Sequence, residues 1–131
     1  MSVVFESEFA TIEVLPEKKI VRHKFHKFIY GDAFQQALIA GRDAFIKNRC
    51  TKWLSDDRLN GVLKSEDLEW GQKNWEAELF KAGWKFWALV LPEKAIGQIT
   101  MKKLIEHYKS LGLTVQTFSD PDEALKWLEK Q

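Results

Sequence analysis

The sequence predicts an α/β fold built on a mixed, mainly parallel five-stranded sheet. An N-terminal antiparallel hairpin opens the sheet, and four helices complete the order β-β-α-β-α-β-α-β-α. Three observations support this prediction. Short apolar or alternating runs recur between longer stretches of helical periodicity, which is typical of a mainly parallel sheet covered by helices. Only a short turn beginning at Pro16 separates the first two runs, so these strands form a hairpin. The length of 131 residues fits one domain over residues 1–131.

Five segments have the pattern of strands. The first two alternate apolar and polar side chains or are rich in β-branched residues, as half-buried strands are. The fourth, "WKFWALVL", is a near-continuous apolar run that ends at Pro92, as expected of a central strand covered on both faces. The predicted strands are residues 9–15, 19–26, 50–54, 84–91 and 113–118.

The first helix is expected over residues 31–47, with its apolar side chains on one stripe. Asp32 is its expected N-cap, because Gln35 follows at the spacing of a capping box. Gly41 lies inside this helix at a cost of about 1 kcal/mol relative to Ala. A close contact between the helix and the sheet would explain it.

Three further helices follow. One begins near Ser65, and another covers at least residues 100–111, with the preceding "PEKAIGQI" left open as loop or earlier helix. The last has the strongest start signal, since Asp120 stands at the cap and Pro121 at the first helical position.

Composition excludes several classes of function. The formal net charge of +1 provides no field that would attract nucleic acid. No apolar run is long enough for a membrane span, and the N-terminus lacks the pattern of a secretory signal. The single cysteine, Cys50, is expected to be a buried or half-buried, unreactive thiol in a reducing compartment, so the predicted location is cytoplasmic. No glycine-rich phosphate loop occurs, and no cofactor is predicted.

The best candidate site is the polar segment "SDDRLNGVLK" that follows the third predicted strand. Loops at the carboxyl ends of parallel strands are where open α/β sheets bind ligands. The alternative is that these polar side chains only satisfy amides of the loop and of the next helix. The candidate surface for a partner or ligand comprises Ser55, Asp56, Asp57, Arg58, Ser65 and Trp70.

Neither metal binding nor catalysis is predicted. The neighbouring Asp56 and Asp57 would suit Mg²⁺ or a phosphoacceptor, but the further acid pair and lysine of a receiver domain are missing. His23 and His26 have odd spacing on a strand, so they point to opposite faces and cannot share a metal ion. No nucleophile–base pair stands out, and the protein is predicted not to be an enzyme.

The aromatic residues offer a second hypothesis. Six Trp and nine Phe can fill a core, but such rings also line ligand pockets. Trp84 and Trp87 are expected on opposite faces of their strand because their spacing is odd. Trp70 and Trp75 diverge around one helix, so Trp70 is either exposed or packed at the core edge if Trp75 points inward.

Three strings, "KWLSDDR", "AGWKFWALVLPE" and "VQTFSDPDEALKWL", together with the element order, resemble bacterial STAS-like proteins. These are relatives of anti-sigma-factor antagonists and are also compared with CRAL-TRIO lipid-binding domains. The resemblance covers residues 9–130 and implies a non-enzymatic regulatory or protein-interaction module. It also makes Ser65 a candidate for phosphorylation, although the antagonist pattern D-S-S-G-L-G is absent. A phosphate there would meet like charge on Glu66 and Asp67, partly offset by the helix N-terminus.

Two functions are therefore expected as alternatives. The first is a regulatory module that contacts a protein partner through the loop and helix start at residues 55–70. The second is a carrier for a small molecule, for instance an apolar or lipid-like ligand, held among the Phe and Trp side chains. A homodimer is left open by both.

Overall fold

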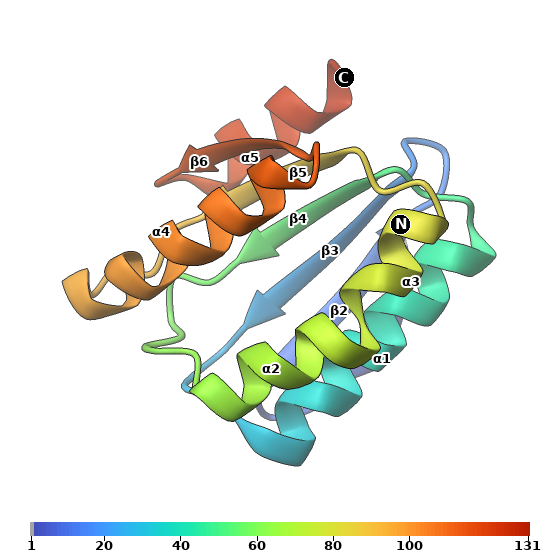
Figure 1. The fold of residues 1–131 in the computed structure, drawn as a ribbon. Coiled ribbons are helices and arrows are strands. Elements are labelled where there is room, and N and C mark those ends of the chain that lie inside the picture. Colours follow the sequence, from blue (N-terminus) through green and yellow to red (C-terminus); the bar gives the residue numbers. More distant parts are fainter. Residues whose placement is uncertain (1) are drawn as a thin grey trace.

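A computed structural model describes residues 2–131, which form one six-stranded sheet with helices on both faces (Figure 1). The strands are β1 (Ser2–Glu6), β2 (Ala10–Leu15), β3 (Ile20–Phe25), β4 (Lys52–Asp56), β5 (Phe86–Val90) and β6 (Thr114–Phe118). The helices are α1 (Gly31–Lys47), α2 (Ser65–Asn74), α3 (Glu76–Lys81), α4 (Ala95–Ser110) and α5 (Pro121–Glu129).

The predicted α/β class and the mixed sheet with N-terminal antiparallel strands are confirmed. The strands lie in chain order, β1-β2-β3-β4-β5-β6, with β1 to β3 antiparallel and β3 to β6 parallel. The additional strand β1 was not predicted. It is an edge strand whose Val3 and Val4 are largely exposed and whose register shifts between Val3 and Phe5. A strand that buries no complete face shows little of the alternation on which the prediction depends.

The order of the strands determines where the helices lie. Each parallel strand is added on the same side of its predecessor, and such crossovers are almost always right-handed. Helices α1 to α4 therefore cover one face of the sheet, while α5 covers the other (Figure 1). The larger core lies between the sheet and α1 to α4.

The second predicted helix is divided in two. It begins at Ser65 as predicted, but the backbone leaves the helical conformation at Trp75, which has φ −127° and ψ −55°. The indole Nε1 of Trp75 donates to the backbone oxygen of Leu38 in α1 at 3.0 Å, so the break directs this ring into the core. The stretch left open before residue 100 is helical, because α4 begins at Ala95.

One of the two predicted caps is confirmed. The carboxylate of Asp120 accepts from the backbone N–H of Asp122, with Pro121 at the first position of α5. Asp32 is not the cap of α1. That position is held by Tyr30 without a side-chain bond, and both carboxylate oxygens of Asp67 in α2 accept from the N–H of Gly31 at 3.1 Å. The start of α1 is thus stabilised by a residue 36 positions later.

Gly41 explains how α1 approaches the sheet. A Cβ at this position would lie 2.5 Å from Cη2 of the Trp53 indole in β4, so the expected close helix–sheet contact exists.

Cys50 is buried as predicted, and this burial raises the pKa of its thiol to about 11. None of the helices in the described part of the chain combines the length and apolar character needed to span a membrane.

We expect Gly41→Ala to lower the free energy of unfolding by up to about 2 kcal/mol in a urea titration. Overpacking costs about 1–3 kcal/mol, and the gain in helix propensity of about 1 kcal/mol offsets part of it. Gly71→Ala in α2 is the matched control, since a Cβ there meets no atom within 4 Å. It should raise the free energy of unfolding by up to about 1 kcal/mol. Equal effects of the two substitutions would contradict this account of the Gly41 contact.

Candidate functional site

Strand β4 sends its polar residues to opposite faces of the sheet. Side chains alternate along a strand, so Trp53, Ser55 and, just beyond the strand, Asp57 face α1 to α4. Leu54 packs in the smaller core under α5. Ser55, Asp56 and Asp57 are only 3%, 4% and 2% exposed, so they do not form a surface that a protein partner could reach.

Asp56 makes a bidentate ion pair with Arg58. Nε and Nη2 of Arg58 lie 2.9 Å from Oδ1 and Oδ2 of Asp56, and this hydrogen bonding raises the pKa of the guanidinium above its ordinary value. The loop is also held by its neighbours, because Oδ1 of Asn60 accepts from the N–H of Ile29 at 3.2 Å and Gly97 in α4 lies against the carbonyl of Gly61. The pair of Asp56 and Arg58 therefore has a structural role in holding the loop.

Asp57 belongs to a different network, which is buried on the other face. Its Oδ1 lies 2.6 Å from Nε2 of His23 on β3, and Nδ1 of the same imidazole lies 3.0 Å from Nε1 of Trp53. An indole N–H can only donate, so Nδ1 of His23 must accept. The ring proton consequently lies on Nε2 and is donated to Asp57, which fixes His23 as the neutral Nε2–H tautomer.

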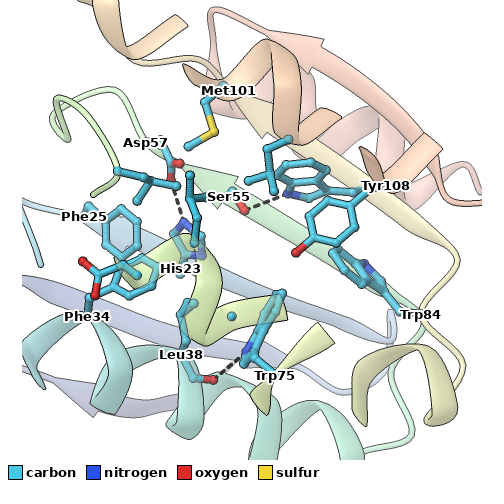
Figure 2. A pocket seen from close by; sticks show the side chains of 16 residues that line it. His23, Phe25, Phe34, Leu38, Ser55, Asp57, Trp75, Trp84, Met101 and Tyr108 are labelled. Atoms are coloured by element: carbon cyan, nitrogen blue, oxygen red, sulfur yellow. Dashed lines mark hydrogen bonds and ion pairs between the residues drawn. The ribbon is translucent and has the colours of Figure 1, made fainter. Parts of the chain in front are cut away.

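A cavity of about 60 Å³ lies between this network and helices α2 and α4 (Figure 2). Its walls are predominantly apolar, and six of the sixteen lining residues are Phe, Tyr or Trp. The rings of Trp84 and Tyr108 meet edge to face at 5.2 Å, and those of Trp87 and Tyr108 at 5.4 Å. The apolar lining residues are Phe25, Phe34, Leu38, Leu63, Leu68, Trp75, Trp84, Trp87, Met101, Leu104 and Tyr108.

The polar groups of the cavity come mainly from the sheet. His23 and Ser55 are register partners on the parallel strands β3 and β4, and both line the cavity together with Asp57. Oγ of Ser55 accepts from Nε1 of Trp87 at 2.8 Å, which leaves the hydroxyl proton of Ser55 available to a ligand. Asp67 also lines the cavity, and both of its carboxylate oxygens accept from the one backbone N–H of Gly31.

A groove between α2 and α4 adjoins the cavity. The groove has a volume of about 300 Å³ and shares two lining residues with the cavity, Leu68 of α2 and Leu104 of α4. Its outer rim is more polar and includes Gln72, Lys103 and His107. These two leucines therefore lie at the boundary between the cavity and the groove.

The structure places the predicted site residues in different surroundings. Ser55 and Asp57 are brought together in the cavity, whereas Asp56 and Arg58 form their own pair. Ser65 is exposed at the first position of α2. Trp70 is half-buried and meets Phe34 edge to face at 6.4 Å, which is packing at the core edge.

Sequence reasoning missed His23 as a site residue and misplaced Trp84. The histidine was considered only as a metal ligand, although a polar residue at an apolar position of a strand already indicates a buried network. Trp84 and Trp87 are not on opposite faces. Strand β5 begins only at Phe86, so the alternation does not extend back to Trp84, and the two rings lie 6.1 Å apart in the same cavity wall.

Among residues 2–131, no group of three or more His, Cys, Asp or Glu side chains has the arrangement of a metal site. His23 bonds to Asp57, whereas Nε2 of His26 lies 2.7 Å from Oγ1 of Thr11. The two histidines thus belong to separate networks. Comparison with protein-family models, with curated proteins and with solved structures found no match to this chain.

We expect long-range ¹H–¹⁵N NMR spectra at neutral pH to show His23 as the neutral Nε2–H tautomer, because Trp53 donates to Nδ1. Trp53→Phe keeps an aromatic ring but removes this donor, so the Nδ1–H tautomer of His23 should become populated in the variant. An Nδ1–H or doubly protonated His23 in the unsubstituted protein would rule out the network described here.

Proposed function

We propose that this protein is a non-enzymatic binding domain that holds a small molecule in the cavity between its sheet and helices α2 and α4. The observation that carries the proposal is an unfilled, aromatic-walled space with a few convergent polar groups, the usual composition of a small-molecule site. Ser55 and Asp57 supply those polar groups from one end of the cavity.

Gly71 is the strongest sign that the space is maintained. It is buried in the interior of α2 and lines the cavity, yet a Cβ there would meet no atom within 4 Å. Glycine within a helix costs about 1 kcal/mol relative to alanine, and cores are otherwise packed with few voids. Any larger side chain here would both stabilise the helix and fill the cavity, so glycine favours an open cavity over maximal stability.

The dimensions indicate how a ligand is held. Drug-sized ligands occupy pockets of roughly 300–1,000 Å³, so the inner cavity of about 60 Å³ suits only a small head group. The groove beyond Leu68 and Leu104 adds about 300 Å³ for a longer tail. A ligand of this shape would cross the gap between α2 and α4.

The polar groups favour binding over catalysis. Both ring nitrogens of His23 are engaged, so this imidazole has no free lone pair with which to activate a nucleophile. Oγ of Ser55 is bonded to Trp87, and no hydrogen bond among the described residues joins it to a base. A nucleophile and a base within hydrogen-bond reach of each other are the usual requirement for acyl-transfer chemistry.

A protein-interaction module of STAS-like type is the second candidate. The observation that favours it is a group of exposed apolar side chains on the loop after β4 and on the start of α4. Leu59 is 52% exposed, Ile96 61% and Ile99 65%, and the loop and helix meet where Gly97 lies against Gly61. Exposed apolar groups of this kind mark partner surfaces when they are contiguous.

To test ligand binding, we would screen small fragments with a polar head and an apolar tail by two-dimensional NMR, following the indole N–H signals of Trp75 and Trp87. We expect Gly71→Met to abolish the shifts, because its side chain fills the cavity. Lys73→Met is the matched control, since it places the same side chain on the exposed side of α2 and should leave binding intact. The proposal fails if no fragment shifts these signals, or if Gly71→Met binds fragments as well as the unsubstituted protein.

If the exposed side chains of Leu59, Ile96 and Ile99 form a partner surface, we expect the protein to self-associate. The double substitution Ile96→Ser and Ile99→Ser should weaken this self-association. Sedimentation velocity from micromolar to millimolar concentration would measure it, with Ile46→Ser as control, because Ile46 is an exposed isoleucine on α1, far along the chain from this group. A monomer at every concentration would count against a homodimer through this surface.

A further inference from the structure

We infer that the ligand is a small organic ammonium ion, whose cationic head lies on Asp57 among the aromatic rings and whose apolar tail passes between Leu68 and Leu104. This inference rests on the proposed binding function and adds the chemical class of the ligand. It follows from the charges, the rings and the shape of the cavity.

The charge of Asp57 has no cationic partner in the structure. Its only ion-pair contact among residues 2–131 is His23, and the donation from Trp53 keeps that imidazole neutral. The cavity lining contains no Lys or Arg within the described chain. Oδ2 of Asp57 receives no hydrogen bond from any described residue, since the bond to His23 uses Oδ1. A carboxylate that is 2% exposed would ordinarily be paired.

Asp67 does not offer the same opportunity. Both of its oxygens accept from Gly31 at 3.1 Å, and its position in the first turn of α2 places it near the positive end of the helix dipole. Asp57 lies on the same side of the sheet as Ser55, and both line the cavity, so we assign the ammonium head to this carboxylate.

The aromatic rings of the cavity wall also favour a positively charged ligand. The faces of Trp, Tyr and Phe rings attract cations through their quadrupole and repel anions. Three of the rings, those of Trp84, Trp87 and Tyr108, form one contiguous cluster on the cavity wall. An ammonium head would be attracted by the carboxylate of Asp57 and by each ring face that it contacts, whereas a carboxylate or phosphate head would be repelled by both.

The shape limits the head to a few atoms and permits a tail. The space of about 60 Å³ accepts a primary or small substituted ammonium group. The tail would contact Leu68 and Leu104, the two residues common to the cavity and the groove.

Three six-carbon probes with different heads test this inference by isothermal titration calorimetry: hexylammonium, hexanol and hexanoate. We expect hexylammonium to bind at least about tenfold more tightly than hexanol, since ion pairing and cation–π contacts each contribute on this scale. Hexanoate should give no measurable binding. The experiment requires no variant, so it stands even if a substitution impairs folding.

Asp57→Asn tests the assigned residue. The amide oxygen can still accept from Nε2 of His23, so the network is retained while the charge is removed, and the preference for hexylammonium over hexanol should disappear. Asp56→Asn is the matched control, because it removes a neighbouring carboxylate that belongs to the Arg58 pair and does not line the cavity. It should keep the preference.

The outcomes separate this inference from the proposed function. If hexanol or hexanoate binds as tightly as hexylammonium and Gly71→Met abolishes that binding, the cavity binds ligands but does not select cations, and the ammonium assignment is overturned. The assignment also fails if none of the three probes binds while other fragments still shift the Trp75 and Trp87 signals. An ammonium preference that survives Asp57→Asn would exclude Asp57 as its origin.

Discussion

The hydrogen bond from the Trp53 indole to Nδ1 of His23 is the interaction on which the polar part of the cavity depends. It directs the proton of His23 to Nε2 and so determines how Asp57 is oriented. The bond in turn requires the indole to lie in one position, and Gly41 of α1 packs directly against the far edge of that ring. Helix packing, imidazole tautomer and the direction of a buried carboxylate are thereby coupled through a single side chain.

The topology explains why the space lies beneath helices and not at a crevice between strands. Open α/β sheets that wind in two directions bind ligands where the strand order reverses, but here the parallel strands β3 to β6 follow one another without reversal. All crossover helices are therefore on one face. Because the helix is interrupted at Trp75, between α2 and α3, the indole of this residue enters the core. Side chains of moderate size, such as Leu68 and Leu104, then form the wall between α2 and α4.

Much of the fold could be predicted because helices and parallel strands leave local signals in the sequence, such as hydrophobic period and the N-cap of α5. The predicted third strand ended at residue 54, so the sequence pattern did not separate Asp56 from Asp57, which the structure places on opposite faces. What the sequence could not provide was the partner of each. His23 and Asp57 are 34 residues apart, and Asp67 caps a helix from 36 residues away, so neither contact has a local signature. Trp84 was assigned to the wrong face because the ends of a strand are the least certain part of a periodic pattern. An error of one residue at a strand end reverses the face to which a side chain is assigned.

The same residues that weaken the core also define the proposed site, and this is the physical argument for a ligand. A core selected for stability alone would replace Gly71 by a larger residue and would pair or remove Asp57, since both substitutions improve packing or relieve desolvation. Here a buried helix glycine faces open space, and a buried carboxylate has a neutral imidazole as its partner. A bound organic cation would fill the open space beside Gly71 and would neutralise the charge of Asp57. On this account the unliganded domain is less stable than its fold allows, and the ligand supplies the missing contacts by mass action.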